Sequence, residues 1–380
     1  MQSQPRYRPA WLPVALLLSL AVSLLLFATL VFKQGKPVSP VSEQSVDTTS
    51  QKQYKWKLVT SWPKNFPGLG TAPENFARLV KDMSNGRLDI TVYGANERVP
   101  ALGVFGAVSS GSVEMGHSGA YYWRGKIPAA VFFSTVPFGM NAQEQNGWLH
   151  YGGGLALWRE LYAPFNLIPF AAGNSGVQMG GWFNKEINSV GDLNGLKMRI
   201  PGLGGEVLSR AGGAAVTIAG GELYTALQSG VIDATEWVGP YNDLAFGFHQ
   251  IAQYYYYPGW HEPGTTLELT VNKQAYESLP LDLQTIIEVA ARAINQDMLD
   301  EYTSRNNGAL AELVDKHNVD VRPYPKAVLT HLEAISRDMY RDLSAQDASF
   351  AKVYTSYRAY LEAARKYHDI SEAAYYRQRQ

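Results

Sequence analysis

Two residues of opposite charge stand where short predicted strands end. Arg199 lies near the end of the run L-K-M-R-I-P, and Glu236 follows the run V-I-D-A-T and precedes Trp237. Ligands of α/β proteins collect at the carboxyl ends of strands, so both positions are candidate ligand contacts. The planar guanidinium of Arg199 fits a carboxylate, which predicts capture of a small organic acid. The competing interpretation is a surface arginine in a loose ion pair.

Glu236 has three interpretations: a general acid, a metal ligand, or a strand-end carboxylate that faces water. Gln178, in the run N-S-G-V-Q-M, offers a neutral amide oxygen. A carboxylate, an amide oxygen and a main-chain carbonyl form an oxygen cage that suits Na⁺ or Ca²⁺ and not a soft metal. Such a cation would bridge Glu236 to a bound carboxylate that the glutamate would otherwise repel.

Aromatic residues are further candidates for the lining of a pocket. Tyr121, Tyr122 and Trp123 are adjacent, but the chain has 23 tyrosines, so core packing is the commoner role for a tyrosine here. The run G-L-G-G-E-V fails the G-x-G-x-x-G spacing, and neither G-x-S-x-G nor H-E-x-x-H occurs in the sequence. No catalytic constellation emerges.

The composition is that of a globular protein. Hydrophobic residues make up 46% of the 380 positions and charged residues 18%, and the length has room for two domains of ordinary size. The formal net charge is −1 and there is no run of Lys and Arg, which excludes nucleic acid as a partner. The absence of cysteine removes disulfides, thiolate zinc sites and thiol catalysis together.

The N-terminus predicts export. Residues 11–32 carry no charge and follow Arg6 and Arg8. A spanning helix needs about 20 apolar residues and a signal-peptide core about 7–15. Residues 1–32 are therefore either a signal peptide or, as the length favours, an uncleaved membrane anchor. Residues 33–53 are rich in Ser, Thr, Gln, Pro and Val and predict a flexible linker.

The sequence pattern from residue 54 onward predicts an α/β architecture with two lobes. It opens with a strand, a helix and a strand between residues 54 and 93. Residues 107–118 and 226–237 then follow one plan: the end of a helix, a Ser-Gly stop, and a short strand with an acid at its third position. Their similarity predicts two lobes built alike, with a cleft between facing strand ends. Long strands near residues 168–183 and 259–273 are expected to cross between the lobes.

The expected division of the chain follows from these crossings. Residues 54–174 and 263–325 make lobe I, and residues 175–262 make lobe II. Residues 326–380 are predicted to form C-terminal helices and are a candidate dimerisation element. The last helix, roughly 348–378, places apolar residues on one stripe. They are Phe350, Val353, Tyr354, Tyr357, Leu361 and Ala364.

From residue 54 to about residue 344 the chain resembles the substrate-binding proteins of tripartite ATP-independent periplasmic (TRAP) transporters. The motifs that carry the resemblance are A-V-S-S-G-S-V-E-M-G, V-P-F-G-M-N-A-Q-E, D-L-N-G-L-K-M-R-I-P-G, A-L-Q-S-G-V-I-D-A-T-E-W and V-N-K-Q-A-Y-E-S-L-P. The arginine segment and the Q-S-G-V-I-D-A segment are specific in combination, and their order and spacing also match. The branch that binds 2-oxo acids, with a cation that helps to hold the ligand carboxylate, is the most similar.

The resemblance implies a role for each candidate residue. Arg199 would clamp the ligand carboxylate. Na⁺ or Ca²⁺ would be held by Gln178, Glu236 and the carbonyl of Trp237, and Glu262 in the run W-H-E-P is a further candidate ligand of the cation. Tyr121 and Tyr122 would close over the carbon tail of the ligand.

The resemblance also implies a function and partners. The expected protein is an extracytoplasmic subunit that captures a small monocarboxylate, either a 2-oxo acid such as pyruvate or a 2-hydroxy acid. It would deliver this ligand to a small and a large membrane subunit, and it would form a homodimer through the long C-terminal helix. The apolar run 11–32 departs from the family pattern and predicts a periplasmic protein tethered to the inner membrane. The alternatives are an anchored carboxylate-sensing receptor and a cation-dependent hydrolase or lyase that uses Glu236.

Overall fold

The computed structural model of the chain describes residues 21–25, 27, 29 and 52–379. Residues from Gln53 onward form one compact unit, which is the part described below. Most of the predicted N-terminal segment 1–32 and of the linker 33–53 lies outside the described residues. Among the described residues, no helix combines the length and the apolar character that crossing a membrane requires.

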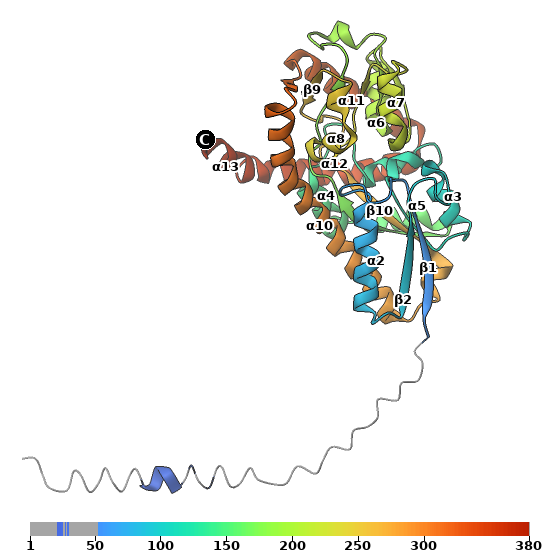
Figure 1. Cartoon of the computed structure of the whole chain (residues 1–380), viewed down its shortest axis with the longest axis vertical. Helices are drawn as coiled ribbons and strands as arrows, with labels where there is room; N and C mark the ends of the chain where they lie inside the picture. Colours follow the sequence, from blue (N-terminus) through green and yellow to red (C-terminus); the bar gives the residue numbers. More distant parts are fainter. Residues whose placement is uncertain (1–20, 26, 28, 30–51, 380) are drawn as a thin grey trace, which may run out of the picture. The chain divides into compact units, whose positions relative to one another are not determined.

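Five strands form the first sheet (Figure 1). In spatial order they are β2 (Leu88–Tyr93), β1 (Tyr54–Thr60), β3 (Met115–Ser118), β10 (Thr266–Asn272) and β4 (Leu167–Asn174). β1 runs parallel to β2 and β3, and β10 runs antiparallel to β3 and β4. All seven residues of β10 are buried, because this strand lies between two others and is covered on both faces.

Six strands form the second sheet. In spatial order they are β11 (Asp320–Pro323), β9 (Tyr254–Tyr257), β5 (Gly181–Phe183), β8 (Ala234–Thr235), β6 (Lys197–Arg199) and β7 (Ala214–Val216). β5 is antiparallel to β8 and β9, whereas β6 is parallel to both β7 and β8. The two mixed sheets confirm the predicted α/β class.

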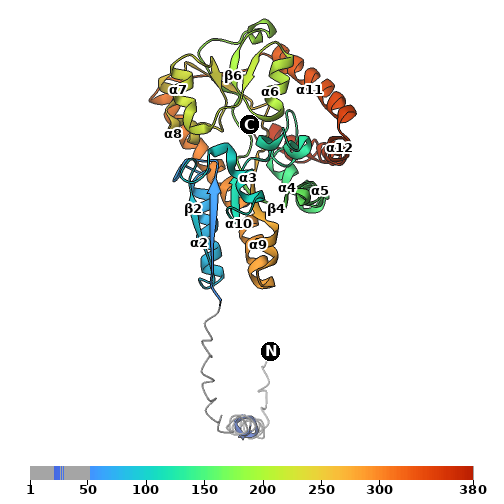
Figure 2. The same ribbon diagram turned by 90° about the vertical axis from the view of Figure 1, so that its right-hand side faces the viewer.

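Helices cover both sheets (Figure 2). They are α2 (Thr71–Met83), α3 (Val104–Ser109), α4 (Ala142–Tyr151), α5 (Gly154–Tyr162), α6 (Gly202–Arg210), α7 (Leu223–Gln228), α8 (Pro240–Phe246), α9 (Lys273–Glu277), α10 (Leu281–Asp315), α11 (Lys326–Gln346), α12 (Ala348–His368) and α13 (Glu372–Gln378). α3 with β3, and α7 with β8, confirm the two predicted helix–stop–strand units. α10 packs against β4 and α2 at the first sheet and against α8 at the second.

Two chain segments cross between the sheets side by side. Residues 175–180 lead from β4 to β5, and residues 258–265 lead from β9 to β10. The Gln178 amide N donates to the Glu262 carbonyl at 3.1 Å, and the Gly259 amide N donates to the Gln178 carbonyl at 2.9 Å. A Cβ at Gly259 would lie 2.3 Å from that Gln178 oxygen, so glycine is required for this close approach. The two crossings are therefore one packed unit.

The strand β11 corrects one predicted boundary. The sequence predicts residues 263–325 in lobe I, whereas β11 pairs with β9 in the second sheet. α10 is consequently a third connection between the two sheets. A strand of four residues has too short a pattern to show which sheet it joins, and its partner strand decides its place.

The C-terminal helices correct the predicted dimerisation stripe. The predicted helix 348–378 is two helices, α12 and α13, separated at residues 369–371. Phe350, Val353 and Tyr357 of the stripe are buried within the chain itself, where the rings of Phe350 and Tyr357 pack on Phe132 at 4.8 and 5.2 Å between centroids. The periodicity predicted a buried face correctly, but this face is covered by the chain's own core.

Candidate functional site

The site is built where strands of both sheets end. β6 and β8 are parallel neighbours with Arg199 opposite Thr235, so Arg199 and the following Glu236 share one sheet edge. The first sheet contributes the 3₁₀ turn Ala120–Trp123, which follows β3 and carries Tyr121 and Tyr122. The crossing segments contribute Gln178 and Glu262. The structure thus brings together all the residues that the sequence singled out, namely Tyr121, Tyr122, Gln178, Arg199, Glu236, Trp237 and Glu262.

Arg199 is held on every side. It is 1% exposed, which excludes the surface interpretation. Its guanidinium pairs with the Glu236 carboxylate, and its Nη2 donates to the Tyr122 hydroxyl at 3.1 Å. Its Nε donates to the Ile218 carbonyl at 3.2 Å, and its Cζ lies 5.2 Å from the centroid of the Trp237 ring. Burial is the largest influence and lowers the pKa of Arg199, but Glu236, together with Tyr122, Tyr121 and Glu262, outweighs it and raises the pKa above its ordinary value.

Glu262 and Gln178 form a second buried cluster. The Gln178 Nε2 donates to Glu262 Oε2 at 2.8 Å and to Thr265 Oγ1 at 3.2 Å. The Thr265 hydroxyl donates to the same Glu262 oxygen at 2.6 Å. Burial, and next the nearby Glu236, raise the pKa of Glu262 to about 8. Glu262 is therefore largely protonated at neutral pH, whereas a carboxyl in water is ionised there.

Several buried polar atoms of this cluster have no hydrogen-bond partner. They are Gln178 Oε1, Glu236 Oε2, Trp237 Nε1 and both ring nitrogens of His261. His261 Nε2 lies 3.5 Å from Glu236 Oε2, and ligand atoms of Glu236, His261 and Glu262 lie within 4.8 Å of one another. Buried polar atoms are normally paired, because each unpaired one costs about 1–3 kcal/mol. Carboxylate and amide oxygens among them fit a hard cation such as Na⁺ or Ca²⁺.

Trp62 lines the site, and the sequence analysis did not identify it. It lines the small space of about 10 Å³ that also touches Arg199 and Gln178. Its Nε1 donates to His117 Nδ1 at 2.9 Å, and His117 Nε2 donates in turn to the Ala172 carbonyl at 2.9 Å. Burial lowers the pKa of His117 to about 4, so the ring is neutral and accepts from Trp62. Trp62 follows β1, and the strand-end rule that selected Arg199 could have selected it too.

His261 is a second residue that the sequence interpretation left aside. It is 1% exposed and directly precedes Glu262 in the second crossing segment. A lone histidine in a sequence is most often a satisfied structural group, as His117 is here. Only the packing of the crossing segment against Glu236 distinguishes the two histidines.

Comparisons with known proteins identify relatives that cover most of the chain. The chain is 46% identical over 321 residues to the "Monocarboxylate 2-oxoacid-binding periplasmic protein" of Nostoc sp., which covers 84% of this chain and 88% of that protein. A TRAP periplasmic solute binding protein from Pseudoalteromonas atlantica, with bound sodium and pyruvate, has a TM-score of 0.85 and 46% identity, and covers 87% of this chain and 100% of its own. One from Colwellia psychrerythraea, with bound calcium and pyruvate, has a TM-score of 0.83 and 48% identity over 85% of this chain and 99% of its own.

The family follows from the extent of the match. The pattern of family 7 of the bacterial extracellular solute-binding proteins, known as DctP, matches residues 58–347, which is more than half of the chain. These proteins are solute receptors of transporters. The chain therefore belongs to the DctP family of solute-binding proteins and is not an enzyme.

Proposed function

We propose that this protein binds a small 2-oxo acid such as pyruvate together with Na⁺ or Ca²⁺ and presents the ligand to the two membrane subunits of a TRAP transporter. The observation that carries the proposal is the pair of unpartnered buried oxygens, Gln178 Oε1 and Glu236 Oε2, beside the buried Arg199. The similarity to proteins with bound pyruvate and a cation supports the same ligand class.

The roles of the residues follow from their chemistry. Gln178, Glu236 and the Trp237 carbonyl hold the cation, with Glu262 as a further ligand. Arg199 receives the ligand carboxylate on the side where its Nη2 now donates to Tyr122. Trp237 also contacts the ligand, and Tyr121 and Tyr122 cover it.

Charge balance explains why the site needs a cation. Arg199 and Glu236 neutralise each other, so a carboxylate ligand would add one uncompensated buried charge. A cation bound beside Glu236 would cancel that charge.

The location of the protein is extracytoplasmic, as its family requires. We propose in addition that residues 11–32 stay attached and tether the protein to the inner membrane. The reason for this proposal is the length of the uncharged run, which is about that of a spanning helix. The protein should then remain in membranes after a salt wash. A mature N-terminus between residues 33 and 53 would contradict the tether and, with it, the anchored-receptor alternative.

A homodimer through the C-terminus is the remaining part of the proposal. α13 has no buried residue, and Tyr367, Ile370, Tyr375 and Tyr376 are exposed apolar side chains on and before it. Clustered exposed apolar residues are typical of an interaction surface. Light scattering of the chain and of a form truncated after Ser371 should show a dimer and a monomer, and equal masses would exclude this contact.

Removing cations should weaken pyruvate binding. We expect the affinity to fall by roughly tenfold or more when Na⁺ and Ca²⁺ are replaced by a large organic cation, because the buried ligand charge is then uncompensated. Isothermal titration calorimetry measures the pyruvate affinity with and without these cations. Glu236→Gln should bind weakly with or without cations, whereas Glu268→Gln, a buried acid outside the site, should keep the cation dependence. Tighter binding by Glu236→Gln, with no cation dependence in the parent, would refute the cation site.

Arg199→Ala should lower both affinity and stability. The change leaves Glu236 buried without a partner, which typically costs about 3–5 kcal/mol. The double variant Arg199→Ala/Glu236→Gln should regain part of the unfolding free energy but no ligand affinity. Arg322→Ala, which removes a solvent-accessible ion-pair residue, should lower stability far less than Arg199→Ala. An unchanged denaturant midpoint for Arg199→Ala would show that the pair does not hold the site together.

Trp62 should set the ligand size. Replacing the indole with leucine enlarges the space at the carbon tail, and one methylene in an apolar pocket is worth about 1–3 kcal/mol. Trp62→Leu should therefore shift the ratio of pyruvate to 2-oxovalerate affinity by roughly tenfold or more toward the longer acid. Trp56→Leu, the same change at a buried tryptophan outside the pocket, should leave the ratio unchanged. If Trp62→Leu leaves the ratio of the two affinities unchanged, the carbon tail of the ligand contacts residues other than Trp62.

A further inference from the structure

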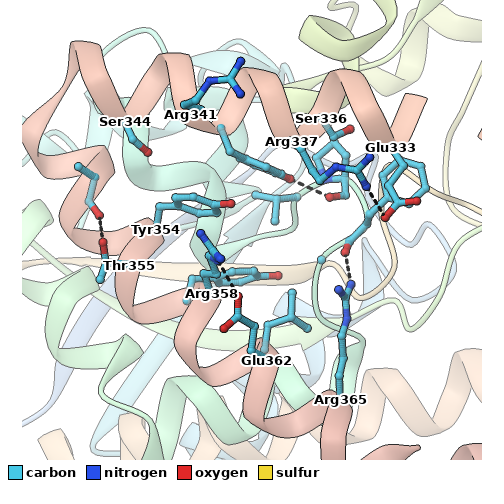
Figure 3. Close-up of a pocket in the computed structure, with 18 residues that line it drawn as sticks. Glu333, Ser336, Arg337, Arg341, Ser344, Tyr354, Thr355, Arg358, Glu362 and Arg365 are labelled. Atoms are coloured by element: carbon cyan, nitrogen blue, oxygen red, sulfur yellow. Dashed lines mark hydrogen bonds and ion pairs between the residues drawn. The ribbon is translucent and has the colours of Figure 1, made fainter. Parts of the chain in front are cut away.

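A second cavity lies outside the cleft, between α11 and α12 (Figure 3). Its volume is about 600 Å³, within the range of about 300–1,000 Å³ typical of small-molecule sites. Its floor is apolar and aromatic and includes Tyr340, Tyr354 and Leu361, and its end is closed by the loop 136–139. Figure 3 shows Tyr354 and Arg358 directed into the space between the two helices. We call this space the helix groove.

The two walls of the helix groove rest on different sheets. α11 packs against α6, beside the second sheet, and the Arg210 Nη1 donates to Asp342 Oδ2 at 2.7 Å across this contact. α12 packs against α4 and α5 beside the first sheet, and the Trp148 Nε1 donates to Ser356 Oγ at 3.1 Å. α11 also contacts the loop 136–139, because the Tyr340 hydroxyl donates to the Pro137 carbonyl at 2.7 Å, so a movement of one sheet against the other alters contacts along the groove.

The charge of the helix groove favours an anion. Among the described side chains that line it, four are arginines and two are glutamates. Arg337 pairs with Glu333 at 3.0 Å, Arg358 with Glu362 at 2.7 Å and Arg341 with Asp338 at 3.0 Å, which leaves the positive charge of Arg365 in excess at the groove. Guanidinium groups at the edge of an apolar floor suit a carboxylate or sulfonate with an aromatic or aliphatic body.

A direct contact path joins the helix groove to the cleft. Arg365 Nη2, which lines the groove, donates to the Phe138 carbonyl at 2.7 Å. The Phe138 amide N donates to the Trp260 carbonyl at 2.8 Å, and the two rings stack 5.8 Å apart. Trp260 directly precedes His261 and Glu262 of the candidate site. Phe138 has φ +54°, an uncommon conformation for a non-glycine residue, which these contacts on both sides hold in place.

We propose that the helix groove is a second binding site, for an organic anion with an aromatic or aliphatic body, and that its occupation favours the closed cleft. In this structure Arg199 and Glu236 are buried and Tyr122 of the first sheet region reaches Arg199, so the cleft is closed while the groove is open to a ligand. A ligand that fits the groove in this state stabilises this state. By reciprocity it raises the affinity of the cleft for its own ligand. The coupling, though not the groove site itself, rests on the proposed function.

The test uses 8-anilinonaphthalene-1-sulfonate as the probe and N-phenyl-1-naphthylamine as its neutral counterpart. We expect saturable fluorescence from the sulfonate at one site per chain, at least about tenfold tighter than the neutral probe, because the arginines select the charge. Ala351→Phe places a ring in the groove and should weaken the sulfonate about tenfold or more. Ala359→Phe, on an exposed position of the same helix outside the groove, should leave its affinity unchanged.

The coupling has two readouts. With saturating sulfonate, the affinity for pyruvate should rise by roughly fivefold or more, and Ala351→Phe should abolish this rise. Small-angle scattering should show a smaller radius of gyration with the sulfonate alone.

No saturable binding of the sulfonate, or equal binding by Ala351→Phe and the parent, would overturn the groove site. A parent dimer that Ala351→Phe converts to a monomer would show that a second copy occupies the groove and would overturn the proposal for a small anion. If the sulfonate binds saturably but pyruvate does not bind with either Na⁺ or Ca²⁺ present, the groove site is retained and the proposed function is rejected.

Discussion

The buried ion pair of Arg199 and Glu236 is the interaction on which the site depends. Both side chains are 1% exposed, so each is tolerable only because the other is present. The pair exists because β6 and β8 are parallel neighbours whose ends coincide, with Arg199 opposite Thr235. Since the pair is neutral, it cannot supply the counter-charge for an anionic ligand. The cation proposed for the site therefore follows from the buried pair and is not an independent assumption.

The crossing segments determine where the remaining ligand atoms lie. The Gln178 amide nitrogen is fully used by Glu262, Ser175 and Thr265, which leaves its oxygen as the free polar atom. This arrangement needs the close backbone contact that Gly259 permits. The residues proposed for the cation thus belong to the connections between the sheets as well as to a strand end. A ligand that bridges them acts on the relative position of the two sheets, which is how binding in such a site is converted into closure.

The sequence was sufficient for the parts of the protein that depend on local pattern. Short apolar strands with glycine stops revealed the α/β class, and the strand-end rule selected Arg199, Glu236 and Trp237. Gln178 entered as a neutral amide oxygen and Glu262 only through the family resemblance, because their proximity arises from two segments more than 80 residues apart. Trp62 was missed since a tryptophan near a strand is commonly a core residue. The sequence did not predict that β11 belongs to the second sheet, because the pattern of a four-residue strand does not show which strand it pairs with.

The C-terminal helices show the same limit and add a constraint. A stripe of apolar residues on α12 establishes that one face is buried, but it does not identify the covering surface, which here is the chain's own Phe132. α11 and α12 are joined by only one residue, Asp347, and pack against each other, and they contact helices beside different sheets. Three connections alone would allow the sheets to separate about the crossing segments. This helix pair adds packed contacts to both sides, so opening the cleft requires a change in α11–α12 packing as well as rotation at the crossings.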